Sequence, residues 1–149
     1  MYKLQHFKPQ ELVSKSTYNA RGSKSIELMD ERILITLDQL RINLGRPITV
    51  NNWIWNGQFQ QRGLRTQEAK EYSKYSQHTF GRAVDFDVKG MSASEVRAHI
   101  LTNINLYPFI SFVEVGINWV HVDVRNCDLT CWHPKRGVLS VEQVLSEQL

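Results

Sequence analysis

The stretch SQHTFGRAVDFDV, residues 76–88, places a turn directly before an alternating segment. From position 83 onward, Val84, Phe86 and Val88 share one face, whereas Asp85 lies on the opposite face with small or acidic neighbours. Alternation over six residues predicts a strand with one face in the core and one polar face. This strand is the element around which the rest of the chain is arranged.

Helical spacing of apolar residues and serine-based capping boxes predict helices elsewhere in the chain. They are expected over residues 9–15, 26–44 and 93–103, and from about 141 onward. Further strands are expected over residues 47–52 and as two strands joined by a tight turn within 109–124. Residues 16–25 are predicted to form a loop, and residues 53–76 a long irregular segment that could wall a substrate site. This order predicts a single α+β domain over 1–149, with a small antiparallel sheet and helices packed on one side.

The composition is typical of a soluble globular chain that needs no disulfide bond or partner for its stability. Hydrophobic residues make up 42% of the 149 residues and charged residues 22%, and no apolar run approaches the length of a membrane span. The net charge of +3 would help association with anionic polymers. The N-terminal sequence lacks the apolar core of a secretory signal, so synthesis in the cytoplasm is expected, without contact with a membrane.

A second motif, NWVHVDVR at residues 118–125, also alternates and places His121 on a polar strand face. If this strand lies beside residues 83–88, His78, Asp85 and His121 can meet around one ion. Gly81 would relieve crowding where the chain turns between the first two ligands. Two imidazoles and one carboxylate, with a fourth position left open, are the ligand count of a catalytic zinc site.

The two motifs together resemble a known family. The pattern Ser-x-His-x-x-Gly-x-Ala-x-Asp, followed by an apolar strand with His-Val-Asp, is similar to zinc D-alanyl-D-alanine carboxypeptidases and to the L-alanyl-D-glutamate endopeptidases of phage endolysins, which share the fold of the hedgehog signalling domain. The residues that carry the match are Ser76, His78, Gly81, Ala83, Asp85, His121 and Asp123.

The resemblance implies a phage-encoded hydrolase. It implies Zn²⁺ bound by His78, Asp85 and His121, with Ser76 on the substrate side of the site. The expected substrate is a peptidoglycan stem peptide or cross-link, cut by carboxypeptidase or endopeptidase action. The protein would then reach the cell wall on phage lysis or as part of the virion, and it is expected to act as a monomer.

The position of a general base departs from the family pattern. Many members carry a carboxylate three residues before the last ligand, or a histidine two before it, but this chain has asparagine and tryptophan there. A two-residue hairpin turn at 117–118 would place Glu114 directly opposite His121, with Cβ atoms about 5 Å apart. Glu114 is therefore the first candidate base. Asp123 is the alternative, and it could instead be a hydrogen-bond partner of the ligand His121.

Substrate-binding groups are less well marked. The family's usual Ser-Gly-Tyr-Arg context is missing, and Arg62 and Arg65 are the guanidinium groups available upstream of the first ligand. Either could clamp a peptide carboxylate with two hydrogen bonds, or remain an exposed loop residue. Trp53, Trp55 and Trp119 are candidates for the groove, with ordinary packing as the alternative reading.

Three other interpretations stay open at this point. The missing carboxylate permits a catalytically degenerate metal-binding module with a virion-structural or wall-binding role. A basic, aromatic-rich nucleic-acid binder is a further reading, but it leaves the histidine motif unexplained, so no nucleic-acid partner is expected. Cys127, Cys131 and His133 offer a rival zinc site at an uncommon spacing, and we expect the two cysteines to be reduced and inert.

Overall fold

Six short strands form one sheet in the order β1-β2-β4-β3-β5-β6 in the computed structural model, which describes residues 1–149. Every neighbouring pair is antiparallel except β3 and β5, which run parallel, so the predicted antiparallel sheet is confirmed at all pairs but this one. The strands are β1 Ile48–Thr49, β2 Ala83–Val88, β3 Phe112–Glu114, β4 Val120–Asp123, β5 Thr130–His133 and β6 Gly137–Leu139.

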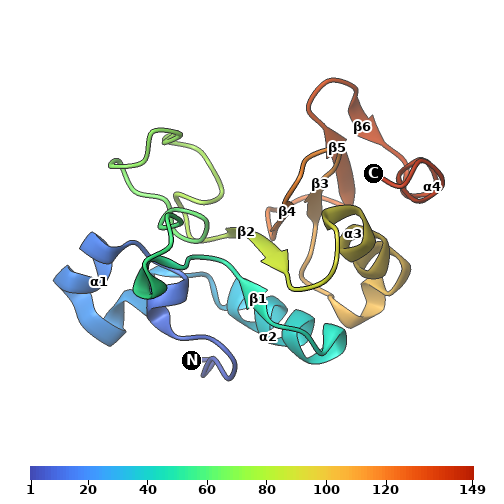
Figure 1. Ribbon diagram of the computed structural model, residues 1–149. Coiled ribbons are helices and arrows are strands. Elements are labelled where there is room, and N and C mark those ends of the chain that lie inside the picture. The colour runs from blue at the N-terminus through green and yellow to red at the C-terminus, as the bar shows by residue number, and fades with distance from the viewer.

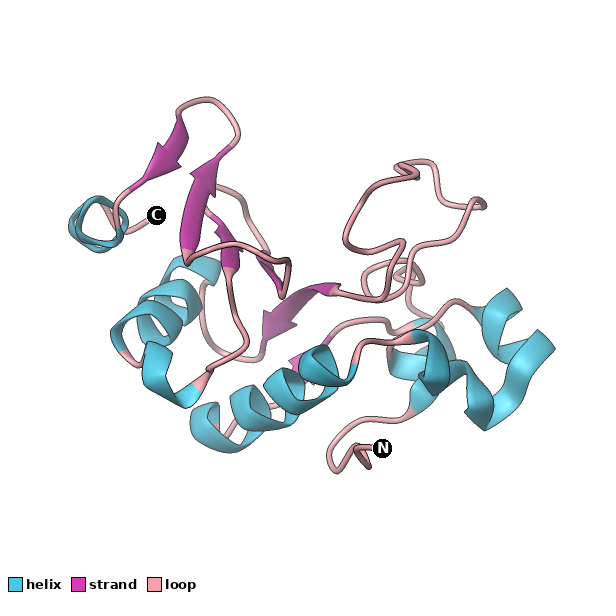
Figure 2. Ribbon diagram, turned by 180° about the vertical axis from the view of Figure 1, so that it is seen from behind, coloured by secondary structure: helices cyan, strands magenta, loops and turns pink.

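Helices lie along one side of this sheet, as Figure 2 shows from behind. One cluster of 27 buried residues joins inward side chains of α2 and α3 to the valines and Phe86 of β2 and β4. The α-helices are α1 Lys15–Arg21, α2 Glu31–Leu44, α3 Ala93–Thr102 and α4 Val141–Ser146, and the short 3₁₀ helices are η1 Pro9–Glu11, η2 Gly22–Leu28, η3 Trp53–Trp55 and η4 Ile104–Leu106. The α+β class with helices on one side is thus confirmed.

Several elements differ from the sequence-based expectation. The helix expected over residues 9–15 is only the 3₁₀ helix η1, and the strand expected over residues 47–52 is only the two-residue strand β1. Helix α1 lies where a loop was predicted, and none of its residues is buried, so it has no apolar period to reveal it. Helix α2 begins at Glu31 rather than at 26, because the Asp30 side chain caps it by accepting from the Arg32 amide. The β5–β6 hairpin was not predicted; there Cys131 is buried in the core.

The β3–β4 pairing has the predicted register. Glu114 lies directly opposite His121, and on the other edge of β4 Asp85 also lies opposite His121. The connection is longer than the two-residue turn expected, because the last pair of the β3–β4 ladder is Glu114 with His121. Gly116 takes a left-handed φ of 75° within this connection. The central strands therefore bring both motifs onto one polar sheet face.

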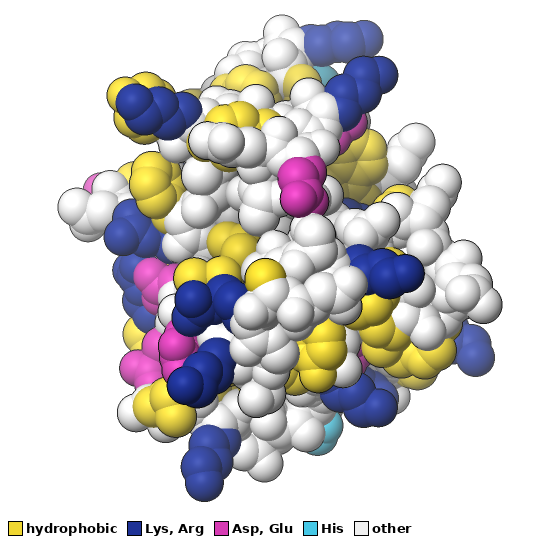
Figure 3. Space-filling model, turned by 90° about the vertical axis from the view of Figure 1, so that its left-hand side faces the viewer, with side chains coloured by type: hydrophobic (Ala, Val, Ile, Leu, Met, Phe, Trp, Pro, Cys, Tyr) yellow, Lys and Arg dark blue, Asp and Glu magenta, His cyan; other side chains and the backbone are white.

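The long segment between η3 and β2, green in Figure 1, projects beside the polar end of β2. It is tied to the body of the protein by the Leu64 amide, which donates to the Leu12 carbonyl at 2.8 Å, and by the Asp85 amide, which donates to the Arg62 carbonyl at 2.7 Å. On the face in Figure 3, Lys and Arg side chains are interspersed with acidic and hydrophobic ones. None of the helices combines the length and the apolar character needed to cross a bilayer.

Candidate metal centre

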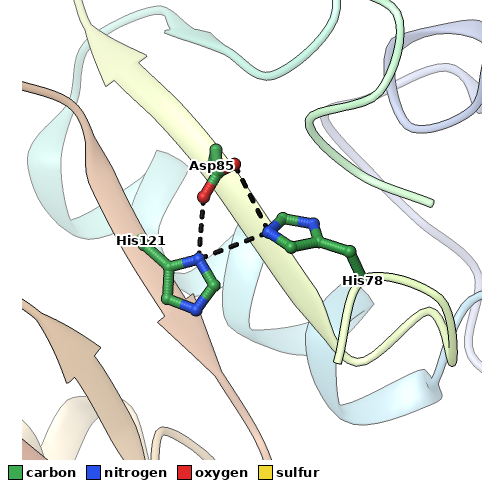
Figure 4. Close-up of side chains that lie close together, drawn as sticks. All are labelled: His78, Asp85 and His121. Carbon is green, nitrogen blue, oxygen red and sulfur yellow. Dashed lines mark hydrogen bonds and ion pairs between the residues drawn. The ribbon is translucent and has the colours of Figure 1, made fainter. Parts of the chain in front are cut away.

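Three side chains from separate parts of the chain converge at the polar end of the sheet (Figure 4). His78 comes from the turn before β2, Asp85 from β2 and His121 from β4, and they are 3%, 7% and 8% exposed. His121 Nδ1 lies 2.7 Å from Asp85 Oδ1 and 3.3 Å from His78 Nε2, and His78 Nε2 lies 3.3 Å from Asp85 Oδ2. The three residues each offer one potential ligand atom, and these atoms all lie within 4.8 Å of one another.

Backbone contacts fix the ring of His78. Its Nδ1 lies 2.9 Å from the Gly63 carbonyl oxygen, which can only accept, so Nδ1 carries the proton and Nε2 faces the site with a lone pair. The backbone amide of His78 also donates to Ser76 Oγ at 3.3 Å. Ser76 thus stabilises the turn that carries the histidine, and its side chain lines the site pocket as well.

The turn between His78 and β2 requires a glycine at position 81. Gly81 has a φ of +66°, and a Cβ there would lie 2.2 Å from the Leu28 carbonyl oxygen. Its own carbonyl accepts from the Asp30 amide at 2.9 Å, which ties the turn to the start of α2. The sequence-based role of Gly81, relief of crowding at the turn, therefore has a specific cause: close approach of the Leu28 backbone.

His121 is oriented by a carboxylate on its own strand. Its Nε2 lies 3.2 Å from Asp123 Oδ2, so Nε2 donates and Nδ1 is turned towards Asp85. Asp123 is fully buried and also accepts from Arg125 Nε at 2.8 Å. Such a carboxylate behind a histidine sets the ring's tautomer and orientation.

The electrostatics keep the carboxylates ionised and His121 protonated when no metal competes. Burial alone would raise the pKa of Asp85, but the hydrogen bond from His121 and the close approach of His78 outweigh it and hold that pKa far below its ordinary value. Burial would likewise lower the pKa of His121, yet its hydrogen bonds to Asp123 and Asp85 raise it to about 9. A divalent cation would replace that proton as the positive charge between the acidic groups.

The donor set fits a divalent metal ion. Each imidazole directs one nitrogen at the shared point: that of His78 is unprotonated, and that of His121 carries a proton that a metal ion can displace. The other nitrogen of each ring is held by a hydrogen bond, and Asp85 adds a carboxylate. Two nitrogens and one oxygen leave a coordination position for water or substrate, as in catalytic rather than closed structural sites. Cys127, Cys131 and His133 do not converge in this way: Cys127 is exposed, while Cys131 is in the core.

A pocket of about 510 Å³ opens above the three residues. Glu114 lines it beside His121, and its carboxylate has neither a hydrogen-bond nor an ion-pair partner within the protein. Asp123 is fully buried beneath His121 and is not part of the pocket lining. Of the two carboxylates predicted as bases, only Glu114 is therefore placed to reach a molecule in the pocket.

The two predicted substrate arginines lie on the side of the long segment. Arg65 donates to Asp85 Oδ2 at 3.2 Å and lines the pocket, whereas Arg62 donates to Asp87 Oδ2 at 2.8 Å, further from the three converging residues. A second hollow of about 790 Å³ adjoins the first and shares Arg65, Glu71, Asp85 and Trp119 with it. The two hollows thus form one groove, which includes the candidate metal centre.

The predicted tryptophans divide into packing and groove residues. Trp53 donates its indole N–H to the Val13 carbonyl at 2.9 Å, and Trp55 is 60% exposed outside both hollows. Trp119 lines both. Sequence reasoning missed four further pocket residues, Glu71, Phe112, Arg125 and Trp132. The alternation that places His121 on the polar face also places Arg125 there, but the signal for Trp132 depended on the unpredicted strand β5.

Two buried imidazoles and a buried carboxylate at an open pocket form a candidate metal site of the kind found in metal-dependent hydrolases. The family model for Peptidase M15 matches residues 5–123, which include both motifs, and the chain belongs to this peptidase family. The resemblance inferred from the two motifs is thereby confirmed at the level of the family. No curated protein and no solved structure matches the chain.

Proposed function

We propose that this protein is a zinc-dependent peptidase that hydrolyses peptide bonds of bacterial peptidoglycan. The observation that carries the proposal is the juxtaposition of the His78–Asp85–His121 group with the unpartnered carboxylate of Glu114 in one open pocket. Membership of a peptidase family supplies the reaction class. The wall peptide as substrate rests on the resemblance of the two motifs to wall-cleaving enzymes.

In the proposed mechanism, His78 Nε2, His121 Nδ1 and Asp85 would hold the zinc ion. Zinc bound in such a site acts as a Lewis acid and lowers the pKa of a bound water to about 7. The Glu114 carboxylate accepts the proton of the attacking water and passes it to the leaving amine, because it lines the pocket opposite His121 with no competing partner. Asp123 holds the proton on His121 Nε2 and keeps the ring in place.

Substrate positioning is assigned to the groove walls. Arg65 reaches the pocket from the long segment and can hold a carbonyl or carboxylate of the peptide once Asp85 is engaged by the metal. Ser76 contributes a hydroxyl at the rim. Arg62, paired with Asp87 at the outer part of the groove, is assigned a supporting contact with longer substrates.

The proposed setting is a phage-encoded wall hydrolase that reaches peptidoglycan on lysis or within the virion and acts as a monomer. Support for this setting comes from the similarity of the motifs to phage endolysins. The candidate site itself is built from a single chain, since the ligands and Glu114 all belong to one domain.

The test is incubation of the zinc-loaded protein with purified peptidoglycan, followed by quantification of new amino termini and of released D-alanine. We expect release by the wild type, and a loss of about 10²- to 10⁴-fold in Glu114→Gln with one equivalent of zinc still bound. His78→Ala should lose stoichiometric zinc and activity together. A wild type that binds one zinc but releases nothing would support the metal-binding, non-catalytic module instead.

A further inference from the structure

The metal centre is one end of a row of side chains that crosses four strands. Asp85 on β2 lies opposite His121 on β4, His121 lies opposite Glu114 on β3, and Glu114 lies opposite Trp132 on β5. Residues directly opposite each other in a ladder present their side chains on the same sheet face. Trp132 therefore continues the line that begins with two of the candidate ligands and passes through the candidate base.

Trp132 presents its indole to the pocket rather than to the core. The side chain is 36% exposed and lines the same hollow as His121 and Glu114. Its indole N–H has no hydrogen-bond partner in the protein, in contrast to Trp53. The backbone beneath it is fixed: the Val115 amide donates to the Trp132 carbonyl at 2.9 Å, and its strand neighbour Cys131 is buried.

The spacing along the row sets the distance from the reacting centre. Adjacent strands lie about 4.8 Å apart, so Trp132, two strands from His121, lies about 10 Å from it along the sheet face. An extended peptide advances about 3.3 Å per residue. A substrate lying along the row would therefore reach Trp132 with its third residue from the scissile bond.

We propose that Trp132 forms a binding subsite for the third residue of the substrate peptide, counted from the cleaved bond. The proposal rests on the peptidase function proposed above. The indole face covers the aliphatic surface of that residue, and the indole N–H donates to one of its carbonyl oxygens. The protein then prefers peptides that extend at least three residues to one side of the bond over shorter ones.

This subsite is a property of this chain rather than of the family match. Trp132 lies beyond residues 5–123, the part that the family model covers. Trp119, the other half-exposed tryptophan of the pocket, lies in the connection next to the metal centre and not at the far end of the row. The two tryptophans thus line the pocket from different elements, and only Trp132 is paired with Glu114 in the sheet.

The experiment measures kcat/KM of the zinc-loaded protein on two sets of wall peptides, lengthened by one residue at a time on either side of the cleaved bond. For the wild type we expect an increase of about tenfold when the third residue is added on one side. Trp132→Ala should abolish this increase, so that kcat/KM of the variant no longer rises when the third residue is added. Trp55→Ala, at an exposed tryptophan outside the groove, is the matched control and should retain it.

Two outcomes would overturn the subsite: no increase at the third residue on either side in the wild type, or an increase that persists in Trp132→Ala. Zinc content and thermal unfolding will show whether the alanine variant is folded. If it is not, Trp132→Leu, which keeps an apolar side chain on β5 but removes the indole, takes its place. Failure of the proposed function looks different, because the wild type would then cleave no peptide of any length.

Discussion

Zinc binding should displace a proton from His121, and this makes the metal affinity depend steeply on pH. The Nδ1 atom that would ligate the metal lies 2.7 Å from Asp85 Oδ1, and Nε2 faces Asp123. These two carboxylates raise the pKa of the ring to about 9 against the effect of burial. At neutral pH the metal-free ring therefore carries both protons, and one must leave before zinc can bind.

The magnitude follows from that pKa. Below about pH 9, each unit by which the pH falls lowers the apparent zinc affinity about tenfold, because His121 must lose its proton. Between pH 8 and pH 6 the loss is therefore about 100-fold from His121 alone. Asp85 adds nothing to the slope, because its hydrogen bonds keep it ionised throughout this range.

Competition with a chromophoric zinc chelator at pH 6, 7 and 8 measures the affinity. Calorimetry in buffers of different ionisation enthalpy counts the protons released. We expect about one proton per zinc from His121 near pH 7.5, and a falling affinity towards pH 6. A zinc affinity that stays constant from pH 6 to 8, with no proton released, would refute the account. In that account the two carboxylates keep the metal-free His121 ring protonated, and Nδ1 loses its proton when it binds zinc.

Three further predictions concern the supports of the site. The raised pKa of folded His121 stabilises the metal-free protein fully below about pH 6.5, and this contribution is lost as the pH rises through about 9. Urea unfolding should therefore show a less stable protein at pH 9.5 than at pH 7. Equal stability at the two pH values would contradict the raised pKa. Asp123→Asn should weaken zinc binding 10- to 100-fold by loosening the His121 ring, measured by the same chelator competition, and unchanged affinity would remove its orienting role. Gly81→Ala should cost at least about 2 kcal/mol in urea unfolding, more than Gly45→Ala, because both glycines have positive φ but only the Cβ at 81 meets backbone; equal costs would refute the close approach.

The candidate ligands could be predicted from sequence because each lies in a strongly patterned stretch. The alternation around Asp85 and His121 fixed which face each occupies, and the ladder between β2 and β4 then places them opposite each other. The position of Glu114 could be derived because the number of residues between it and His121 sets the register, even though the turn itself is longer than expected. Period-two patterns thus carried over into the tertiary arrangement.

The elements that sequence reasoning missed lack such a pattern. Helix α1 is polar and has no buried residue, so only its cap, Ser14 accepting from the Thr17 amide, distinguishes it from a loop. Strand β5 pairs in parallel with β3, although β4 lies between them in the chain. No local sequence pattern predicts such a parallel pairing. Missing β5 also meant that Trp132 could not be placed in the groove.

The arginines show a second limit. Residue type alone could not separate Arg62 from Arg65, because both lie in the same irregular segment. The structure separates them through their acidic neighbours: Arg65 reaches Asp85 at the candidate metal centre, whereas Arg62 reaches Asp87, two residues further along β2. Contacts of loop side chains depend on the path of the whole loop, which no short motif encodes.

The central claim is tested most directly by anomalous diffraction at the zinc absorption edge from crystals of the zinc-loaded protein. The account predicts one strong peak within bonding distance of His78 Nε2, His121 Nδ1 and an oxygen of Asp85, with Glu114 facing its open side. A peak at Cys127, Cys131 or His133 instead, or none at the three predicted ligands, would contradict it.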